Sequence, residues 1–284
     1  YKGDGDVIND YHVSRILKTG FTLSQHLGDD GHYQKGGSSI DYSVTADGTL
    51  MDKVTGLEWL YTTSPAKFRV KEDAEAYCAA SGDDWRLPTS KEKTYTIDKA
   101  SAEHDFAVYL FEALSYWGES TYNAENQLIP VICVRGERID TLYVEGLKRN
   151  STDEVVVDTT NGLMWQDDSS TASLTMDWES SINYCESLNH ADYDNWRLPN
   201  INELTYVLPN NVFVNKTTLP TDTPWTYTSS HRNPYWSSTP SYLNTEHAWA
   251  MESISFSYYG FDKTDENYVR CVRDDNSALG GAYQ

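Results

Sequence analysis

The sequence has few of the features that mark membrane proteins, metal centres and nucleic-acid binders. Its longest apolar runs span only a few residues, far short of the roughly 20 that a membrane-spanning helix needs. It is poor in positive charge, with 22 Lys and Arg against 43 Asp and Glu, a formal net charge of −21. Such a chain repels phosphate backbones and anionic lipids. We therefore expect no membrane span and no nucleic-acid partner.

Cysteine is scarce as well. The four cysteines form no C-x-x-C pair and have no histidine at zinc-ligand spacing, so neither a zinc site nor a thioredoxin-like redox site is indicated. Two disulfides are the better interpretation, and they favour an extracellular or cell-surface location. The chain begins at Tyr1 without an initiator methionine, which fits a mature bacterial protein whose signal peptide has been removed.

No catalytic constellation stands out. The seven histidines show no H-E-x-x-H or facial-triad spacing, and no combination of Ser, His and Asp can be singled out. Paired carboxylates that could serve a glycosidase are too abundant in so acidic a chain to carry meaning. We therefore expect a non-catalytic protein.

What the chain does contain is aromatic residues and an internal repeat. There are 21 Tyr and 9 Trp against 7 Phe, so most rings carry a polar group and suit half-exposed binding surfaces. Five sequence blocks recur in one order. The matched blocks are Asp52 to Trp59 with Asp158 to Trp165, Tyr77-Cys78 with Tyr184-Cys185, Asp84 to Pro88 with Asn195 to Pro199, Tyr116-Trp117 with Tyr235-Trp236, and Cys133 to Arg135 with Cys271 to Arg273.

This repeat predicts two tandem domains, residues 18–138 and 139–275, with an N-terminal extension over 1–17 and a tail over 276–284. At about 150 residues per domain, 284 residues fit two. Because each copy holds its own two cysteines, we expect the bridges Cys78–Cys133 and Cys185–Cys271.

Local signals predict an α+β fold with two helices and a small, mostly antiparallel sheet in each copy. Asp177 can cap a helix that carries Cys185 on its apolar face. Capping boxes after each Trp-Arg-Leu-Pro block, Thr89 with Glu92 and Asn200 with Glu203, predict the second helix. Residues 254–258 and 268–273 read as strands.

A bridge from the first helix to the last strand is the plan of the C-type lectin fold. More narrowly, the sequence resembles the Lcl-type C-terminal domain family, named for a bacterial collagen-like adhesin. The resemblance rests on a lead-in from Thr19 to Gly36, the Thr55-Gly56-Leu57 and Trp-Arg-Leu-Pro blocks, Tyr235 to Ser238, and Tyr268 to Arg273. It implies tandem C-type-lectin-like domains and a role in cell-surface attachment or carbohydrate binding.

The tryptophan and arginine residues of the repeated blocks are expected to be structural. A Trp and a Pro beside a helix start serve as a core anchor and a helix entry. A buried arginine needs a partner, which we expect to be buried carbonyls or a carboxylate, such as Asp52 for the first copy and Asp158 for the second. The predicted core residues are Trp59, Trp85, Arg86, Trp165, Trp196, Arg197 and Trp236.

The candidate binding surface lies in the second copy, where 34 residues separate Trp236 from Cys271, compared with 15 between Trp117 and Cys133. Aromatic rings with polar neighbours suit sugar stacking or protein contacts. The competing interpretation, that Trp249 belongs to the core, stays open. The candidate ligand-binding residues are Trp225, Tyr227, His231, Tyr242, Trp249, Tyr259 and Asp262.

No cofactor is expected apart from a structural Ca²⁺, which carboxylate pairs such as Asp83-Asp84 and Asp167-Asp168 could hold, although so acidic a chain contains such pairs by composition alone. The sugar-chelating motifs of calcium-dependent lectins are absent. The second-copy loop holds one lysine, Lys263, among acidic residues. We therefore expect a neutral glycan or a basic protein surface as the partner, and not heparin-like polymers.

Two alternatives remain. In the first, the chain is a structural subunit of an extracellular filament or surface layer, in which the aromatics and residues 1–17 pack against sister subunits as an oligomer. In the second, it is an oxidase like the formylglycine-generating enzymes, which share the broad fold. The second is disfavoured because every cysteine has a duplicated structural counterpart, which leaves no spare thiolate.

Overall fold

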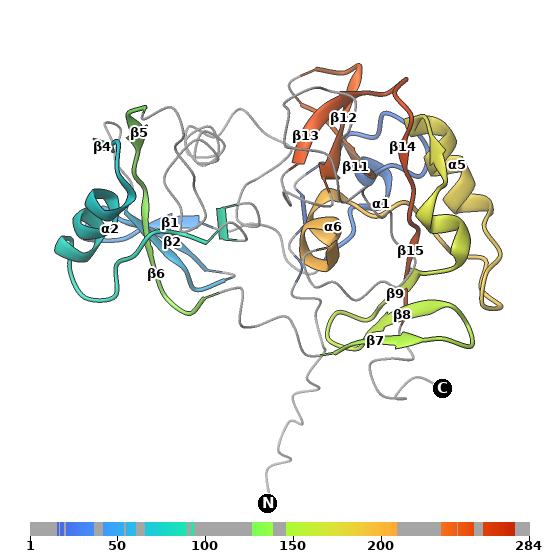
Figure 1. Cartoon of the computed structure of the whole chain (residues 1–284), viewed down its shortest axis with the longest axis horizontal. Helices are drawn as coiled ribbons and strands as arrows, with labels where there is room; N and C mark the ends of the chain where they lie inside the picture. The colour runs from blue at the N-terminus through green and yellow to red at the C-terminus, as the bar shows by residue number, and fades with distance from the viewer. Residues whose placement is uncertain are drawn as a thin grey trace, which may run out of the picture.

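The computed structural model of the chain describes residues 16, 18–19, 21–36, 42–53, 55–60, 66–89, 92–93, 127–138, 146–208, 234–242, 244–252 and 258–275. These residues form several small sheets and helices (Figure 1), so the predicted α+β class is confirmed. None of the helices described is long and apolar enough to cross a bilayer. Of the predicted strand over 254–258, residues 254–257 lie outside the described residues.

The first half, residues 42–138, is built on a four-stranded antiparallel sheet with the order β1-β2-β3-β6. Its strands β2 and β3 meet at a turn in which the Asp52 carboxylate accepts hydrogen bonds from the Thr55 N–H and hydroxyl, while Gly56 takes a φ of 74°, a conformation that glycine adopts without strain. The elements are β1 (Tyr42–Val44), β2 (Leu50–Asp52), β3 (Glu58–Leu60), β4 (Lys67–Phe68), α2 (Lys71–Ala80), β5 (Ile129–Pro130) and β6 (Cys133–Arg135).

The second half, residues 146–275, contains a four-stranded sheet with the order β15-β9-β8-β7. Strands β8, β9 and β15 contain parts of the repeated blocks that β2, β3 and β6 contain in the first half. Both halves therefore arrange their equivalent strands in the same order. Its strands are β7 (Leu147–Asn150), β8 (Val155–Asp158), β9 (Leu163–Gln166) and β15 (Val272–Asp274).

A five-stranded sheet with the order β10-β14-β11-β12-β13 completes the second half. Helices α5 and α6 cover its opposite faces (Figure 1). Ile182 of α5 clusters with Trp236 and Ala250, whereas Leu204 of α6 clusters with Tyr235 and Trp249, as expected when neighbouring residues of a strand point to opposite faces. The elements are β10 (Thr175–Met176), α5 (Trp178–Ser187), α6 (Ile201–Val207), β11 (Pro234–Pro240), β12 (His247–Glu252), β13 (Tyr258–Asp262) and β14 (Asn267–Tyr268), with a 3₁₀ turn over Ser169–Ala172.

Both helix starts of the second half follow from local sequence. The Asp177 carboxylate accepts the Ser180 N–H at the start of α5. At the start of α6, the Asn200 side chain accepts the Glu203 N–H and the Glu203 carboxylate accepts the Asn200 N–H. This is the reciprocal capping box that the sequence predicts.

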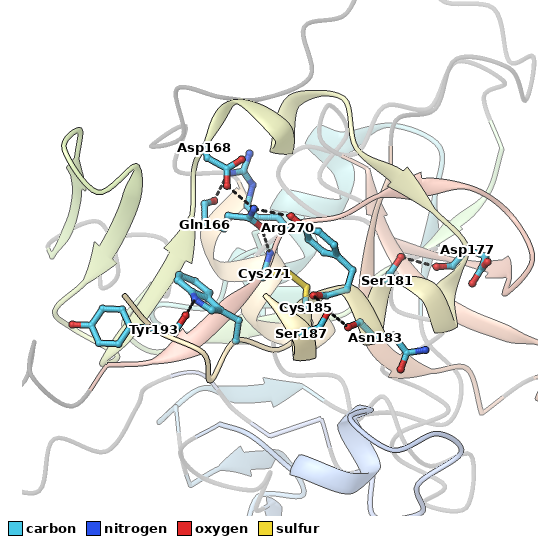
Figure 2. Close-up of a disulfide and its surroundings, with 12 residues drawn as sticks. Gln166, Asp168, Asp177, Ser181, Asn183, Cys185, Ser187, Tyr193, Arg270 and Cys271 are labelled. Carbon is cyan, nitrogen blue, oxygen red and sulfur yellow. Dashed lines mark hydrogen bonds between the residues drawn. A yellow bond between two sulfur atoms is a disulfide. The ribbon is translucent and has the colours of Figure 1, made fainter. Parts of the chain in front are cut away.

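The two disulfides join the cysteines that the repeat pairs, Cys78 with Cys133 and Cys185 with Cys271. In the second half, the bridge ties α5 to the residue before β15 (Figure 2). Next to it, Arg270 donates to the Gln166 carbonyl at 2.6 Å, and the Cys271 N–H donates to the Gln166 side chain at 3.4 Å. The bridge therefore sits in a polar network that also fixes the end of β9.

The predicted core residues Trp59, Trp85, Trp165, Trp196 and Trp236 are all buried. One apolar cluster contains residues of both halves, for example Leu50 and Trp59 with Val156 and Trp165. The halves therefore share buried apolar surface.

The partners of the two repeat arginines differ from the expectation. Arg86 binds Glu92, and Arg197 binds Glu203, each through two hydrogen bonds of 2.7 and 2.8 Å. The expected partners, Asp52 and Asp158, instead bind their own turns. The expectation was wrong because the carboxylate of each capping box, six residues after the arginine, lies within reach once the helix turns back.

Candidate functional site

The candidate surface surrounds β12 and β13, the two strands at one side of the five-stranded sheet. Four of the predicted ligand-binding residues can be placed here: Tyr242, Trp249, Tyr259 and Asp262. The other three, Trp225, Tyr227 and His231, lie outside the described residues.

Strand register places Trp249 and Asp262 on one face of the sheet and Tyr259 on the other. Trp249 lies opposite Gly260, and Ala250 lies opposite Tyr259. Residues that face each other across neighbouring strands point to the same side. Trp249 therefore points to the face covered by α6, and Tyr259 points to the face covered by α5.

Trp249 is a core residue. It is 4% exposed and packs in the cluster that contains Tyr235 and Met251. Tyr242 is partly buried against it, with ring centroids 6.4 Å apart and planes inclined by 50°. The interpretation of Trp249 as a core residue, left open by the sequence, is the one that fits this packing, and Tyr242 supports the same cluster from the edge.

Tyr259 is different, because 42% of its surface is exposed. Of the Phe, Trp and Tyr side chains whose exposure the structure describes, it is the one in the exposed class. Its neighbour on the same face, Phe261, packs edge-on against Trp236 with centroids 6.4 Å apart. A ring that is fixed on a strand beside a packed core loses little conformational entropy when a ligand stacks on it.

The polar groups near this strand are mainly acidic. Asp262 is exposed and accepts hydrogen bonds from the Thr264 N–H at 3.0 Å and hydroxyl at 2.7 Å. These hydrogen bonds, together with the facing His247, lower the pKa of Asp262. The carboxylate is therefore ionised at neutral pH. Glu246, Asp265 and Glu266 are also exposed in this region.

Lys263, the one lysine of this loop, is engaged internally. Its Nζ donates to the Gln25 side chain at 2.7 Å and to the Thr245 carbonyl at 2.8 Å, and it lies 4.4 Å from the centre of the Trp178 ring. Burial lowers the pKa of Lys263. The lysine therefore links the N-terminal segment to α5, and its charge does little to offset the exposed acidic residues of this region.

The sequence did not reveal that residues 21–36 pack on the second half. Gln25, His26, Tyr33 and Lys35 of this segment contact residues numbered 178 to 274. The lead-in motif was visible in the sequence, but a pattern of residues does not show which part of the chain it contacts. We refer to residues 19 and 21–36 as the N-terminal clasp.

In the described part of the chain, no group of three or more His, Cys, Asp and Glu side chains is placed to hold a metal ion. The hypothesis of a structural Ca²⁺ therefore stays a hypothesis. All four cysteines of the sequence are in disulfides.

Residues 154–273 match the family model of the Lcl C-terminal domain. The matched region begins just before β8 and ends within β15, so it covers both sheets and both helices of the second half except for β7. No curated protein matches the chain.

Proposed function

We propose, starting from the Lcl C-terminal domain at residues 154–273, that this protein is a secreted or cell-surface binding protein without catalytic activity. In this proposal the chain carries two tandem C-type-lectin-like domains. The tandem arrangement is supported by the equal strand order of the two halves, by one disulfide in each, and by the equivalent pairs Arg86–Glu92 and Arg197–Glu203. Two buried disulfides fit an oxidising, extracellular environment.

The observation that carries the proposal is the exposed ring of Tyr259 on β13, a strand that ends at the exposed Asp262 and is followed by the exposed acidic residues Asp265 and Glu266. An aromatic face stacks on the apolar face of a sugar or on a protein side chain. Exposed carboxylates repel sulfated polymers and attract basic groups. The ligand class that fits is a neutral glycan, or a protein surface that is neutral or basic.

Replacement of Tyr259 with Ala should weaken binding at least about tenfold, because truncation of a central aromatic contact commonly costs about 2 kcal/mol. The measurement uses the full chain on a panel of immobilised neutral polysaccharides, basic proteins and heparin, at low and at physiological salt. We expect binding to a neutral or basic probe and none to heparin.

The matched control is Val44→Ala, an exposed apolar residue of the first half that is 73% exposed. It should bind every probe as the unchanged chain does. Equal binding by the Tyr259→Ala chain and the unchanged chain would remove Tyr259 from the site. Tight heparin binding that weakens with salt would contradict the charge argument.

A structural subunit is the second candidate function. It is favoured by the clasp, a segment that packs on a half of the chain more than a hundred residues away in sequence. Segments that reach a distant surface in this way are also used between subunits. In that case the acidic surface would face a sister subunit.

A further inference from the structure

The N-terminal clasp is held on the second half by contacts with several of its elements. Tyr33 donates to Glu186 of α5 at 2.8 Å, and Asn200, the cap of α6, donates to the Lys35 carbonyl at 3.0 Å. Lys35 also forms an ion pair with Asp274 of β15. The clasp therefore bridges α5, α6 and the last strand.

The clasp is ordered internally by Asp29. Its carboxylate accepts the N–H groups of Gln25 at 2.6 Å, His26 at 3.0 Å and His32 at 2.9 Å. Gly28 passes so close to α5 that a Cβ there would lie 2.8 Å from Ile182. The segment is thus a shaped loop that fits the second half closely.

At the centre of this interface lies Asp30, which is 2% exposed. Its Oδ2 accepts hydrogen bonds from the hydroxyl of Thr19 in the clasp and from that of Thr239 in β11, the latter at 2.8 Å. Its Oδ1 is buried and has no hydrogen-bond partner. A buried carboxylate oxygen without a partner is costly when the group is charged, so this position favours the neutral acid.

We propose that docking of the clasp depends on pH. Protonation of Asp30 holds the clasp on the second half, and loss of that proton loosens it.

The charged groups that face Asp30 are Glu203 and Arg197. They bind each other through two hydrogen bonds, so their effects on Asp30 largely cancel. Burial is the main cause that raises the pKa of Asp30, to about 7, and the two threonine hydroxyls oppose it. Although burial raises it, the pKa of Asp274, the ion-pair partner of Lys35, is lowered overall by Arg197 and Lys35, so this carboxylate stays ionised at neutral pH.

The sign of the pH dependence follows from these values. In the open clasp Asp30 is in water and titrates near 3.8, whereas in the docked clasp it titrates near 7. The docked form therefore binds more protons between these two pH values. The stabilisation of the docked clasp by the Asp30 proton is fully present below about pH 3.8 and is lost as the pH rises through about 7.

Hydrogen exchange of the backbone amides in the clasp of the full chain tests the proposal, with rates corrected for the intrinsic effect of pH. Between pH 5 and pH 8 the opening equilibrium should rise roughly 10- to 100-fold. In Asp30→Asn, which copies the neutral acid, this rise should be absent. His26 and His32 are present in both chains, so the difference between the two profiles isolates Asp30.

Asp274→Asn provides a control that loosens the clasp by another route. It removes the contacts with Lys35 and Arg197, so opening should increase at every pH while the rise from pH 5 to pH 8 is retained. Identical pH profiles in Asp30→Asn and the unchanged chain would overturn the proposal. Loss of protection in Asp30→Asn at every pH would do so too, because it would show that the charged carboxylate holds the clasp.

Discussion

Trp196→Ala should lower the free energy of unfolding of the second half by about 3–5 kcal/mol, the usual cost of removing a large buried ring. Trp196 is 1% exposed and packs with Trp178, Trp236 and the Cys185 side of α5. Its indole N–H donates to the carbonyls of His190 at 3.2 Å and Tyr193 at 3.1 Å. The substitution leaves both a cavity and a loosened loop, and denaturant unfolding of the full chain measures the loss.

Tyr259→Ala is the appropriate comparison for this variant, because it truncates an exposed ring of the same half and should leave the unfolding midpoint close to that of the unchanged chain. The two variants together separate a core residue from a surface residue. Near-native stability of Trp196→Ala, combined with lost ligand binding, would show that the Trp-Arg-Leu-Pro block belongs to a binding site.

Glu203→Gln should destabilise the second half by about 3–5 kcal/mol, because it breaks a buried ion pair and leaves the Arg197 charge with only the 3.1 Å contact to the partly exposed Asp274. Arg197 has a side chain that is 5% exposed, and its guanidinium makes both of its shortest contacts with Glu203. These contacts, together with Asp274, raise the pKa of Arg197, so the arginine cannot lose its proton to relieve the cost. Unfolding in denaturant at pH 7 provides the measurement.

The repeat supplies a control for this prediction. Glu92→Gln breaks the equivalent pair in the first half, where the hydrogen-bond lengths are the same but the arginine side chain is 21% exposed. Because water can reach Arg86, the cost should be clearly smaller than for Glu203→Gln. Equal costs in the two halves would mean that burial of the arginine does not determine the effect.

Much of the fold could be predicted because its signals are local. The capping boxes at Asn200 and Thr89 each depend on residues three apart, and the disulfides follow from the order of the repeated blocks. The partner of Arg197 could not be predicted in the same way. Its identity depends on how the chain turns into α6, which brings Glu203, and not Asp158, against the guanidinium.

The sequence could indicate which stretch of the chain holds the candidate residues, but not which of them lie at the surface. The sequence indicated the aromatic residues of β12 and β13, whereas the separation of Trp249 from Tyr259 depends on strand register, which places them on opposite faces of the sheet. The clasp was not predictable at all, because the contact between Asp30 and Thr239 joins residues 209 apart in sequence. No local pattern encodes such a contact.

Sedimentation velocity of the full chain over a wide concentration range, without ligand, tests most directly whether this is a binding protein or a structural subunit. A binding protein that acts through Tyr259 should sediment as one small species whose coefficient does not change with concentration. Growth into larger species as the concentration rises, without any added glycan or protein, would contradict the proposed function and favour the structural subunit.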